Sequence, residues 1–327
     1  APRKGMAQKL GVEPIGPLRG TVTVNGAKNA VLPIMAACLL TDEPSIIENV
    51  PHVTDVLTMA QILRQLGVEA AFSGDTLSIA PNGFTGVVAP YESVSRMRAS
   101  ICVLGPLLAR HGRAQVSMPG GCVIGSRPIN LHLKGLQALG ASLTLEHGDI
   151  LAQTRGLRGT RIHLGGTAGS SVLATDNVMM AAALAEGTTI IEHAACEPEV
   201  VDLANVLITM GARIEGHGGP VIRIDGVLAL HGVRHRIIPD RIEAGTLMIA
   251  AAITGGDVTI QGARADHLGA VIDKLTEAGV VIDILDGALR VRAQGPLQSV
   301  DVTTLPFPGF PTDLQAQMTA LMAVSRG

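Results

Sequence analysis

The chain has 327 residues, of which 47% are apolar, yet it contains no Trp, one Tyr and four Phe. This length suffices for two domains with aliphatic cores, and a net charge of −3 without dense Lys/Arg runs argues against nucleic-acid binding. The longest apolar stretches, 31–40 and 244–253, are shorter than the roughly 18 residues that a membrane-spanning helix requires, so no membrane partner is expected.

The first ten residues are basic and polar, and they lack the apolar segment of a secretory signal. The four cysteines, Cys38, Cys102, Cys122 and Cys196, are far apart and show no C-x-x-C spacing. This favours reduced thiols in a cytoplasmic protein over disulfides or a zinc site. The ten histidines form no ligand motif, so neither a metal nor an organic cofactor is expected.

One pattern occurs four times along the chain: an amphipathic helix that ends at a glycine and is followed directly by a strand. Its copies cover 62–72, 135–145, 206–216 and 274–284. Their glycines, Gly67, Gly140, Gly211 and Gly279, are 73, 71 and 68 residues apart. Because glycine adopts the left-handed conformation without a steric penalty, we predict that a helix ends at each of them.

A second pattern has the same period: an apolar helix rich in small residues, a turn and a strand. Its copies cover 27–49, 98–118, 172–193 and 244–262, and these helices are predicted to be buried because they are apolar nearly all round. A fifth copy begins at Thr312, and the sequence ends at Gly327, on the turn before the next strand. These patterns predict an α/β fold of duplicated units, and a chain that is truncated at its C-terminal end.

Three segments carry residues suited to phosphate chemistry. Lys28 and Asn29 stand between a strand and a helix start, where free backbone N–H groups attract anions; the alternative is a simple cap with a solvated lysine. In the Gly-rich segment 118–128, Cys122 lies near Arg127 and Pro128, which predicts a lowered thiol pKa; the alternative is a small residue in a tight turn. Segment 164–171 is rich in Gly and Ser, so that a backbone could approach phosphate closely and Ser170 or Ser171 could cap the next helix; the alternative is an ordinary Gly/Ser loop.

Acid/base candidates are few. Asp313 and Asp240 each stand at the start of a predicted helix, where an aspartate is ordinarily a cap. The other three cysteines lie within or beside apolar runs and are predicted to be buried and inert. The nucleophile with the strongest sequence signal is therefore Cys122.

Taken together, five segments resemble the UDP-N-acetylglucosamine 1-carboxyvinyltransferase family of enolpyruvyl transferases. They are NGAKNA at 25–30, MRASICVLGPL at 97–107, PGGCVIGSRPINLH at 119–132, PDRIEAGT at 239–246 and FPGFPTDLQAQ at 307–317. The resemblance implies a two-domain inside-out α/β barrel, with one domain formed by residues 29–238 and the other by residues 1–28 plus 239–327. It also implies a cytoplasmic transferase of peptidoglycan synthesis, and hence a role in cell-wall biogenesis, cell shape and cell division.

The implied reaction transfers the enolpyruvyl group of phosphoenolpyruvate to the 3′-hydroxyl of UDP-N-acetylglucosamine and releases phosphate. By resemblance, Cys122 donates the proton to the enol and is the target of fosfomycin-type epoxides, and Asp313 is the base near the sugar hydroxyl. The resemblance assigns phosphoenolpyruvate to Lys28, Asn29 and Arg127. It assigns the UDP-sugar to Arg98, Arg127, Pro128, Ile129, Asn130, Leu131, Ser171, Val172 and Asp313.

The chain departs from the family pattern at three positions of the nucleotide site. Asn130 replaces an aspartate, Gly169 replaces a lysine of the diphosphate loop, and Leu173 replaces a glycine. These changes keep open a different nucleotide acceptor, although a cysteine loop argues against the shikimate branch, which lacks one. A second alternative is a non-catalytic relative that retains only the binding site. The sequence does not indicate an oligomeric state.

Overall fold

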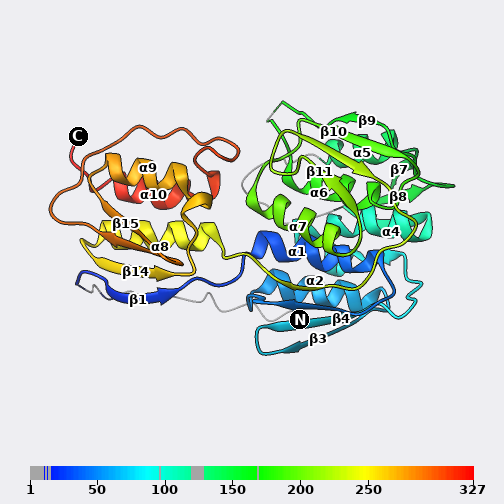
Figure 1. Cartoon of the computed structure of the whole chain (residues 1–327), viewed down its shortest axis with the longest axis horizontal. Coiled ribbons are helices and arrows are strands. Elements are labelled where there is room, and N and C mark those ends of the chain that lie inside the picture. The colour runs from blue at the N-terminus through cyan, green and yellow to red at the C-terminus, as the bar shows by residue number, and fades with distance from the viewer. Residues whose placement is uncertain (1–10, 12, 14–15, 96, 119–128, 168) are drawn as a thin grey trace, which may run out of the picture.

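The computed structural model describes residues 11, 13, 16–95, 97–118, 129–167 and 169–327. In this part of the chain, one unit of helix, strand, helix and β-hairpin occurs four times in succession (Figure 1). The first unit consists of α1 (Lys28–Ala37), β2 (Ser45–Glu48), α2 (Thr54–Gln65), β3 (Glu69–Ser73) and β4 (Thr76–Ala80). The second unit consists of α4 (Leu104–His111), β6 (Arg113–Ser117), α5 (Asn130–Ala138), β7 (Ser142–Glu146) and β8 (Asp149–Gln153). The third unit consists of α6 (Val172–Ala182), β10 (Thr188–Glu192), α7 (Pro198–Thr209), β11 (Arg213–Glu215) and β12 (Val221–Asp225). The fourth unit consists of α8 (Arg241–Ile253), β14 (Asp257–Gln261), α9 (Gly269–Glu277), β15 (Val281–Leu285) and β16 (Ala288–Arg292). The predicted repeat is thus confirmed.

Short elements join or extend the units. The additional strands are β1 (Arg19–Thr23), β5 (Val88–Ala89), β9 (Arg161–His163) and β13 (Arg234–Arg236). The additional helices are η1 (Cys38–Leu40), α3 (Tyr91–Val94), η2 (Arg98–Val103), η3 (Ala265–His267), η4 (Thr312–Leu314) and α10 (Gln315–Met322). Across the described ranges, no helix combines the length and the apolar character needed to cross a membrane.

Each unit contributes three strands to one four-stranded sheet, and the strand orders are β13-β2-β4-β3, β5-β6-β8-β7, β9-β10-β12-β11 and β1-β14-β16-β15. In every sheet a strand from outside the unit pairs parallel with the first strand of the unit, which pairs antiparallel with the hairpin. Two of these added strands come from far away in the sequence, because β13 returns from the third unit to the first and β1 pairs with the fourth. The described strands form separate open sheets, so the expected barrel architecture consists of sheets around helices and not of a closed strand barrel.

The four glycines that were predicted to end helices all have positive φ. The angles are 94° at Gly67, 97° at Gly140, 107° at Gly211 and 98° at Gly279. In each unit the backbone then enters the hairpin directly. The conformational freedom of glycine therefore fixes the same helix-to-hairpin turn in all four units.

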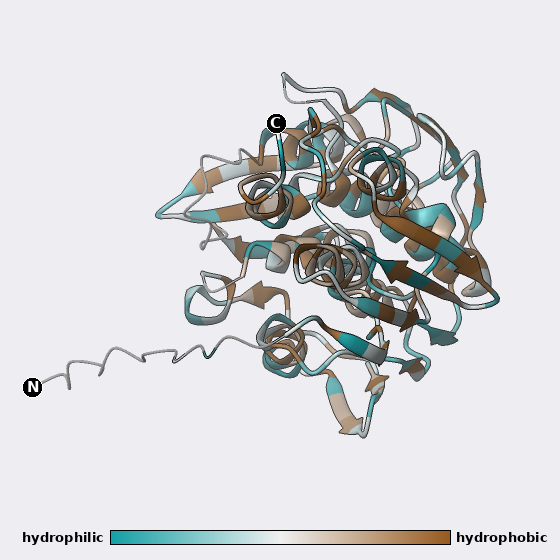
Figure 2. Ribbon diagram, turned by 90° about the vertical axis from the view of Figure 1, so that its left-hand side faces the viewer, coloured by the Kyte–Doolittle hydropathy of each residue, from teal (hydrophilic) through white to brown (hydrophobic). Residues whose placement is uncertain are grey.

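The buried apolar side chains of the described residues form two clusters. The larger joins α1, α4 and α6 to the inner faces of the first three sheets, and the smaller surrounds α8, α10 and the fourth sheet. Apolar residues occur in the central helices and along the strands around them (Figure 2). All residues from Ala30 to Ala37 in α1 and from Ala174 to Ala182 in α6 are buried, as predicted. In α8 the prediction holds only in part, because Ile253 is 37% exposed.

The chain passes between the two clusters twice, and the two passages run side by side. The backbone N–H of Ala27 donates to the carbonyl of Ile238 (2.8 Å), and that of Asp240 donates to the carbonyl of Asn25 (2.9 Å). Gly26, between them, leaves no room for a side chain, because a Cβ atom there would lie 1.8 Å from the carbonyl oxygen of Asn49. The two clusters are therefore joined by a short paired connection (Figure 1).

Candidate functional site

Lys28 and Asn29 begin α1 at this paired connection. One carboxylate oxygen of Asp240 accepts a hydrogen bond from the backbone N–H of Lys28 (3.1 Å), while the other caps α8 by accepting from two backbone N–H groups. The expectation that Asp240 is a helix cap is therefore confirmed. The side chain of Lys28 is 43% exposed, and its ammonium nitrogen lies 3.5 Å from a carboxylate oxygen of Asp55. A partly exposed cation at a helix start can attract an anion.

Two predicted nucleotide-binding elements, η2 and α5, both pack against α6. Arg98 begins η2 and is half-buried, and Asn130 begins α5 and is exposed. Burial, and after it the positive charge of Arg98, lowers the pKa of His132 in the first turn of α5 to about 3. The charge of Arg98 therefore lies within electrostatic range of the first turn of α5.

The Gly/Ser loop that precedes α6 lies against the first turn of α5. A Cβ atom at Gly166 would lie 3.3 Å from Cδ1 of Leu131. Ser171 caps α6 as predicted, because its hydroxyl accepts a hydrogen bond from the backbone N–H of Ala174 (3.4 Å). Leu131 and Val172 are half-buried. This loop and the start of α5 are therefore in contact.

The segment that leads into η4 approaches the same loop. A Cβ atom at Gly169 would lie 3.7 Å from Cγ of Pro306, and the backbone N–H of Phe307 donates to a carboxylate oxygen of Glu197 at the start of α7 (3.4 Å). Asp313 is exposed in η4. Its neighbour Leu314 packs tightly against α8. The segment that carries Asp313 is thus fixed to α8 and begins close to the Gly/Ser loop.

A buried ion pair joins α8 to α7, and the sequence analysis did not predict it. Nε of Arg241 donates to a carboxylate oxygen of Glu199 at 2.9 Å, and the two side chains are only 11% and 4% exposed. The guanidinium carbon of Arg241 also lies 5.7 Å from the centre of the Phe307 ring. The sequence signal was weak: an arginine directly after the cap Asp240 and two glutamates at the start of a helix.

Three predicted site residues, Cys122, Arg127 and Pro128, lie outside the described residues. Ile129, which follows them, is buried. Of the other cysteines, Cys38 and Cys102 are buried as predicted, and burial raises the thiol pKa of Cys38 to about 12 and also raises that of Cys102. Cys196 differs from the prediction because it is only half-buried. Burial still raises its pKa, so it remains a weak nucleophile.

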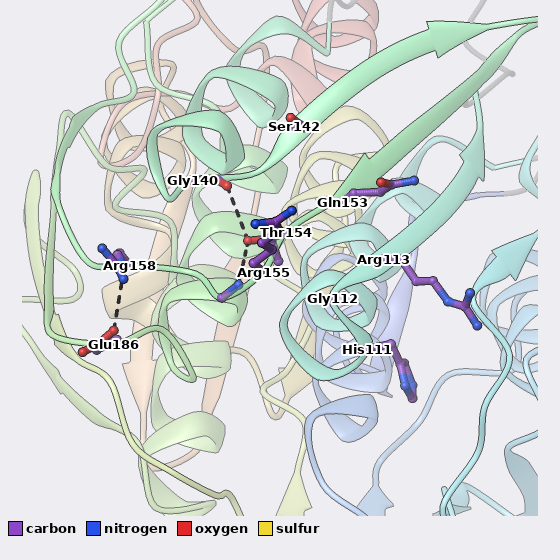
Figure 3. Close-up of a pocket in the computed structure, with 11 residues that line it drawn as sticks. His111, Gly112, Arg113, Gly140, Ser142, Gln153, Thr154, Arg155, Arg158 and Glu186 are labelled. Atoms are coloured by element: carbon purple, nitrogen blue, oxygen red, sulfur yellow. Dashed lines mark hydrogen bonds and ion pairs between the residues drawn. The ribbon is translucent and has the colours of Figure 1, made fainter.

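Within the described ranges, no group of three or more His, Cys, Asp or Glu side chains could hold a metal ion. A cavity of about 840 Å³ lies elsewhere, between the second and third units. Figure 3 shows Arg158 beside Glu186 on one side of this cavity, and Arg113 and His111 on the other. The cavity contains no predicted site residue, and Arg158 and Glu186 are more than four-fifths exposed. It is an open surface hollow and is separate from the candidate site.

Comparison with solved structures defines the class of the protein. The enolpyruvyl transferase NikO from Streptomyces tendae superimposes with a TM-score of 0.85 at 25% identity, covering 95% of this chain and 74% of that one. An EPSP synthase from Acinetobacter baumannii matches with a TM-score of 0.66 at 19% identity, covering 87% of this chain and 66% of that one. The fold is that of the enolpyruvyl transferases.

Sequence comparison narrows the assignment. Residues 12–327 match the family model of EPSP synthase (3-phosphoshikimate 1-carboxyvinyltransferase). UDP-N-acetylglucosamine 1-carboxyvinyltransferase 1 from Caldanaerobacter subterraneus is 52% identical over 98% of this chain and 77% of its own length. The protein of the same name from Staphylococcus aureus is 54% identical over 95% and 74%. The chain therefore belongs to the EPSP synthase family of carboxyvinyltransferases and, within it, to the UDP-N-acetylglucosamine 1-carboxyvinyltransferases.

Proposed function

We propose that this carboxyvinyltransferase moves the enolpyruvyl group of phosphoenolpyruvate onto the 3′-hydroxyl of UDP-N-acetylglucosamine and releases phosphate. This would be the first committed step of peptidoglycan precursor synthesis, in the cytoplasm. The observation that carries the proposal is identity above 50% to relatives of that name over nearly the whole chain. The two substrates carry a phosphate, a carboxylate and a diphosphate. These anionic groups fit a site whose described part contains Lys28 and Arg98 at helix starts.

The reaction needs three proton transfers, one new C–O bond and cleavage of the C2–O bond to phosphate. The sugar 3′-oxygen attacks C2 of the enol and loses its proton, while C3 gains a proton; the tetrahedral adduct then loses a C3 proton and phosphate. We assign the proton donation at C3 to Cys122 and the acceptance of the hydroxyl proton to Asp313. The exposure of Asp313, on a segment anchored to α8, is compatible with a base that meets a bound sugar.

Charge neutralisation is assigned to the cationic side chains. Lys28, Asn29 and Arg127 would bind phosphoenolpyruvate, where arginine allows paired hydrogen bonds to a carboxylate or phosphate. Arg98, the segment 127–131, Ser171 and Val172 would bind the UDP-sugar. The proximity of the Gly/Ser loop to Leu131 supports this grouping.

We further propose that the two clusters belong to two domains, residues 29–238 and residues 1–28 plus 239–327. The reaction is proposed to proceed without a metal or an organic cofactor, because lysine and arginine groups supply the positive charge. A cleft between two domains would close over the substrates and exclude water, as in other two-domain transferases.

The test is phosphate release from phosphoenolpyruvate with UDP-N-acetylglucosamine as acceptor. We expect turnover in the wild type, and a loss of about a hundredfold or more in Cys122→Ala and in Asp313→Asn, in the range that removal of an acid or base produces. Cys196→Ala is the matched control, since that thiol lies outside the proposed site, and it should keep wild-type activity.

The outcomes separate the alternatives. Turnover only with another nucleotide acceptor would favour the interpretation based on Asn130, Gly169 and Leu173. A folded wild-type protein that releases no phosphate with any acceptor would favour the non-catalytic alternative and refute the proposal.

A further inference from the structure

One polar side chain in the middle of the larger core makes three hydrogen bonds to three different segments. Asn177, on α6, is fully buried. Its Oδ1 accepts from the backbone N–H of Gly105 (2.6 Å), and its Nδ2 donates to the carbonyl of Ile101 (2.8 Å). The same Nδ2 lies 3.1 Å from Nδ1 of His132, which is 2% exposed. An amide thus joins η2 and α4 on one side to α5 on the other.

Glycines allow this close approach. A Cβ atom at Gly105 would lie 2.5 Å from Oδ1 of Asn177 and 2.4 Å from its backbone oxygen. A Cβ atom at Gly135, on α5, would lie 2.2 Å from a methyl group of Val178, the next residue of α6. Both neighbouring helices therefore meet α6 at glycines, on either side of Asn177, and only this spacing lets one short side chain reach both.

The partners fix the orientation of the amide. The Gly105 N–H can only donate, so the atom that faces it is the oxygen; the Ile101 carbonyl can only accept, so the atom that faces it is the nitrogen. The second amide hydrogen then points at Nδ1 of His132, which must be unprotonated to accept it. His132 is consequently neutral, with its only ring proton on Nε2. Its pKa, lowered by burial and then by Arg98, agrees with a neutral ring.

The segments that Asn177 joins are those that carry the proposed nucleotide-binding residues. Ile101 belongs to η2, which begins at Arg98, and His132 is in the first turn of α5, which begins at Asn130. We infer that Asn177 is a positioning residue for the nucleotide end of the site: it holds η2 and the first turn of α5 in register and keeps His132 as the neutral Nε2–H tautomer. This inference rests on the proposed function, because it assumes that Arg98 and Asn130 bind the UDP-sugar.

Aspartate is the informative replacement because it has the same shape and can still accept from Gly105. It has no hydrogen for the Ile101 carbonyl or for Nδ1 of His132, so the ring would have to carry a proton on Nδ1. The matched control is Asn205→Asp on α7, where Oδ1 of an exposed asparagine lies 3.2 Å from Nε2 of His217. Both changes turn an asparagine beside a histidine ring into an aspartate, but only the first is buried.

The first experiment is calorimetric titration with UDP, together with separate KM values for the two substrates. Asn177→Asp should weaken UDP binding about tenfold, as expected when a buried hydrogen-bond network loses its donors, and raise the KM for the UDP-sugar by a similar factor. The KM for phosphoenolpyruvate should change less than about twofold, and Asn205→Asp should match the wild type. Unchanged UDP binding in Asn177→Asp would overturn the inference, as would an equal rise in both KM values.

A second variant tests the route through His132. His132→Phe should weaken UDP binding as much as Asn177→Asp does, and the double variant should be no weaker than either single variant. Fully additive losses would show that Asn177 does not act through His132. If the wild-type protein itself binds neither UDP nor the UDP-sugar, the proposed function fails, which this design distinguishes from failure of the inference.

Nitrogen-15 NMR of the wild-type protein needs no substitution and therefore does not depend on whether a variant folds. The two ring nitrogens of His132 should give the shifts of an unprotonated Nδ1 and a protonated Nε2 from pH 5 to pH 8. A protonated Nδ1 in this range would overturn the assigned network.

Discussion

The burial of His132 predicts a specific loss of stability in mild acid. Its pKa is lowered from 6.5 to about 3, chiefly by burial and secondly by Arg98. Below pH 6.5 the unfolded chain therefore takes up a proton that the folded chain cannot accept until the pH approaches 3. A group with a depressed histidine pKa contributes stability at neutral pH that is lost as the pH falls through this window.

The magnitude follows from proton linkage, in which each pKa unit corresponds to about 1.36 kcal/mol. At pH 7 the unfolded imidazole is mostly neutral, and at pH 5 it is almost fully protonated. The free energy of unfolding should therefore fall by about 2 kcal/mol between pH 7 and pH 5 because of His132 alone. The comparison is with His132→Phe, which removes the titrating group.

Urea unfolding followed by circular dichroism at pH 7 and pH 5 measures both proteins. His132→Phe is expected to be less stable than the wild type at pH 7, since it leaves the amide of Asn177 without one acceptor. Its loss between pH 7 and pH 5 should nevertheless be smaller by about 2 kcal/mol, because all other titrating groups contribute equally and cancel. Equal losses in the two proteins would mean that His132 is not held neutral, and the reasoning would be refuted.

Two further predictions concern buried ionisable side chains. Both carboxylate oxygens of Asp176 are buried without a hydrogen-bond partner among the described residues, and burial, then two neighbouring glutamates, raise its pKa well above 3.8. The folded protein thus keeps a proton that the unfolded chain releases, so the free energy of unfolding falls as the pH rises above 3.8. In thermal unfolding, Asp176→Asn should therefore be more stable than the wild type at pH 8, with a smaller gain at pH 5. Arg241→Met should cost about 3–5 kcal/mol in urea unfolding, because it leaves Glu199 charged and buried. The exposed pair of Arg234 and Glu48 is the control, and Arg234→Met should change stability by less than about 1 kcal/mol. A similar cost for both arginine variants would contradict the argument from burial.

Most of the local structure could be predicted from the sequence. A glycine that follows a helix needs no partner to adopt positive φ, and so Gly67, Gly140, Gly211 and Gly279 end their helices as predicted. An apolar stretch of small residues must be buried wherever the chain folds, which holds for α1 and α6. Of the candidate site, the helix starts at Lys28 and Arg98 and the cap at Ser171 follow from short-range patterns; their binding roles remain predictions.

Only the tertiary structure decided which distant segments meet. No local feature of β13 indicates that it pairs with β2, since any exposed strand edge offers the same backbone groups. The two strands are far apart in the sequence, because Val233 and Ser45 are separated by 188 positions. Likewise, the sequence shows Asn177 only as one of three successive polar residues in an otherwise apolar helix, and Glu199 only as a charged residue in a first turn. Their partners, His132 and Arg241, are selected by how helices pack, because a buried polar group is stabilised only by the group that packing brings within hydrogen-bond distance.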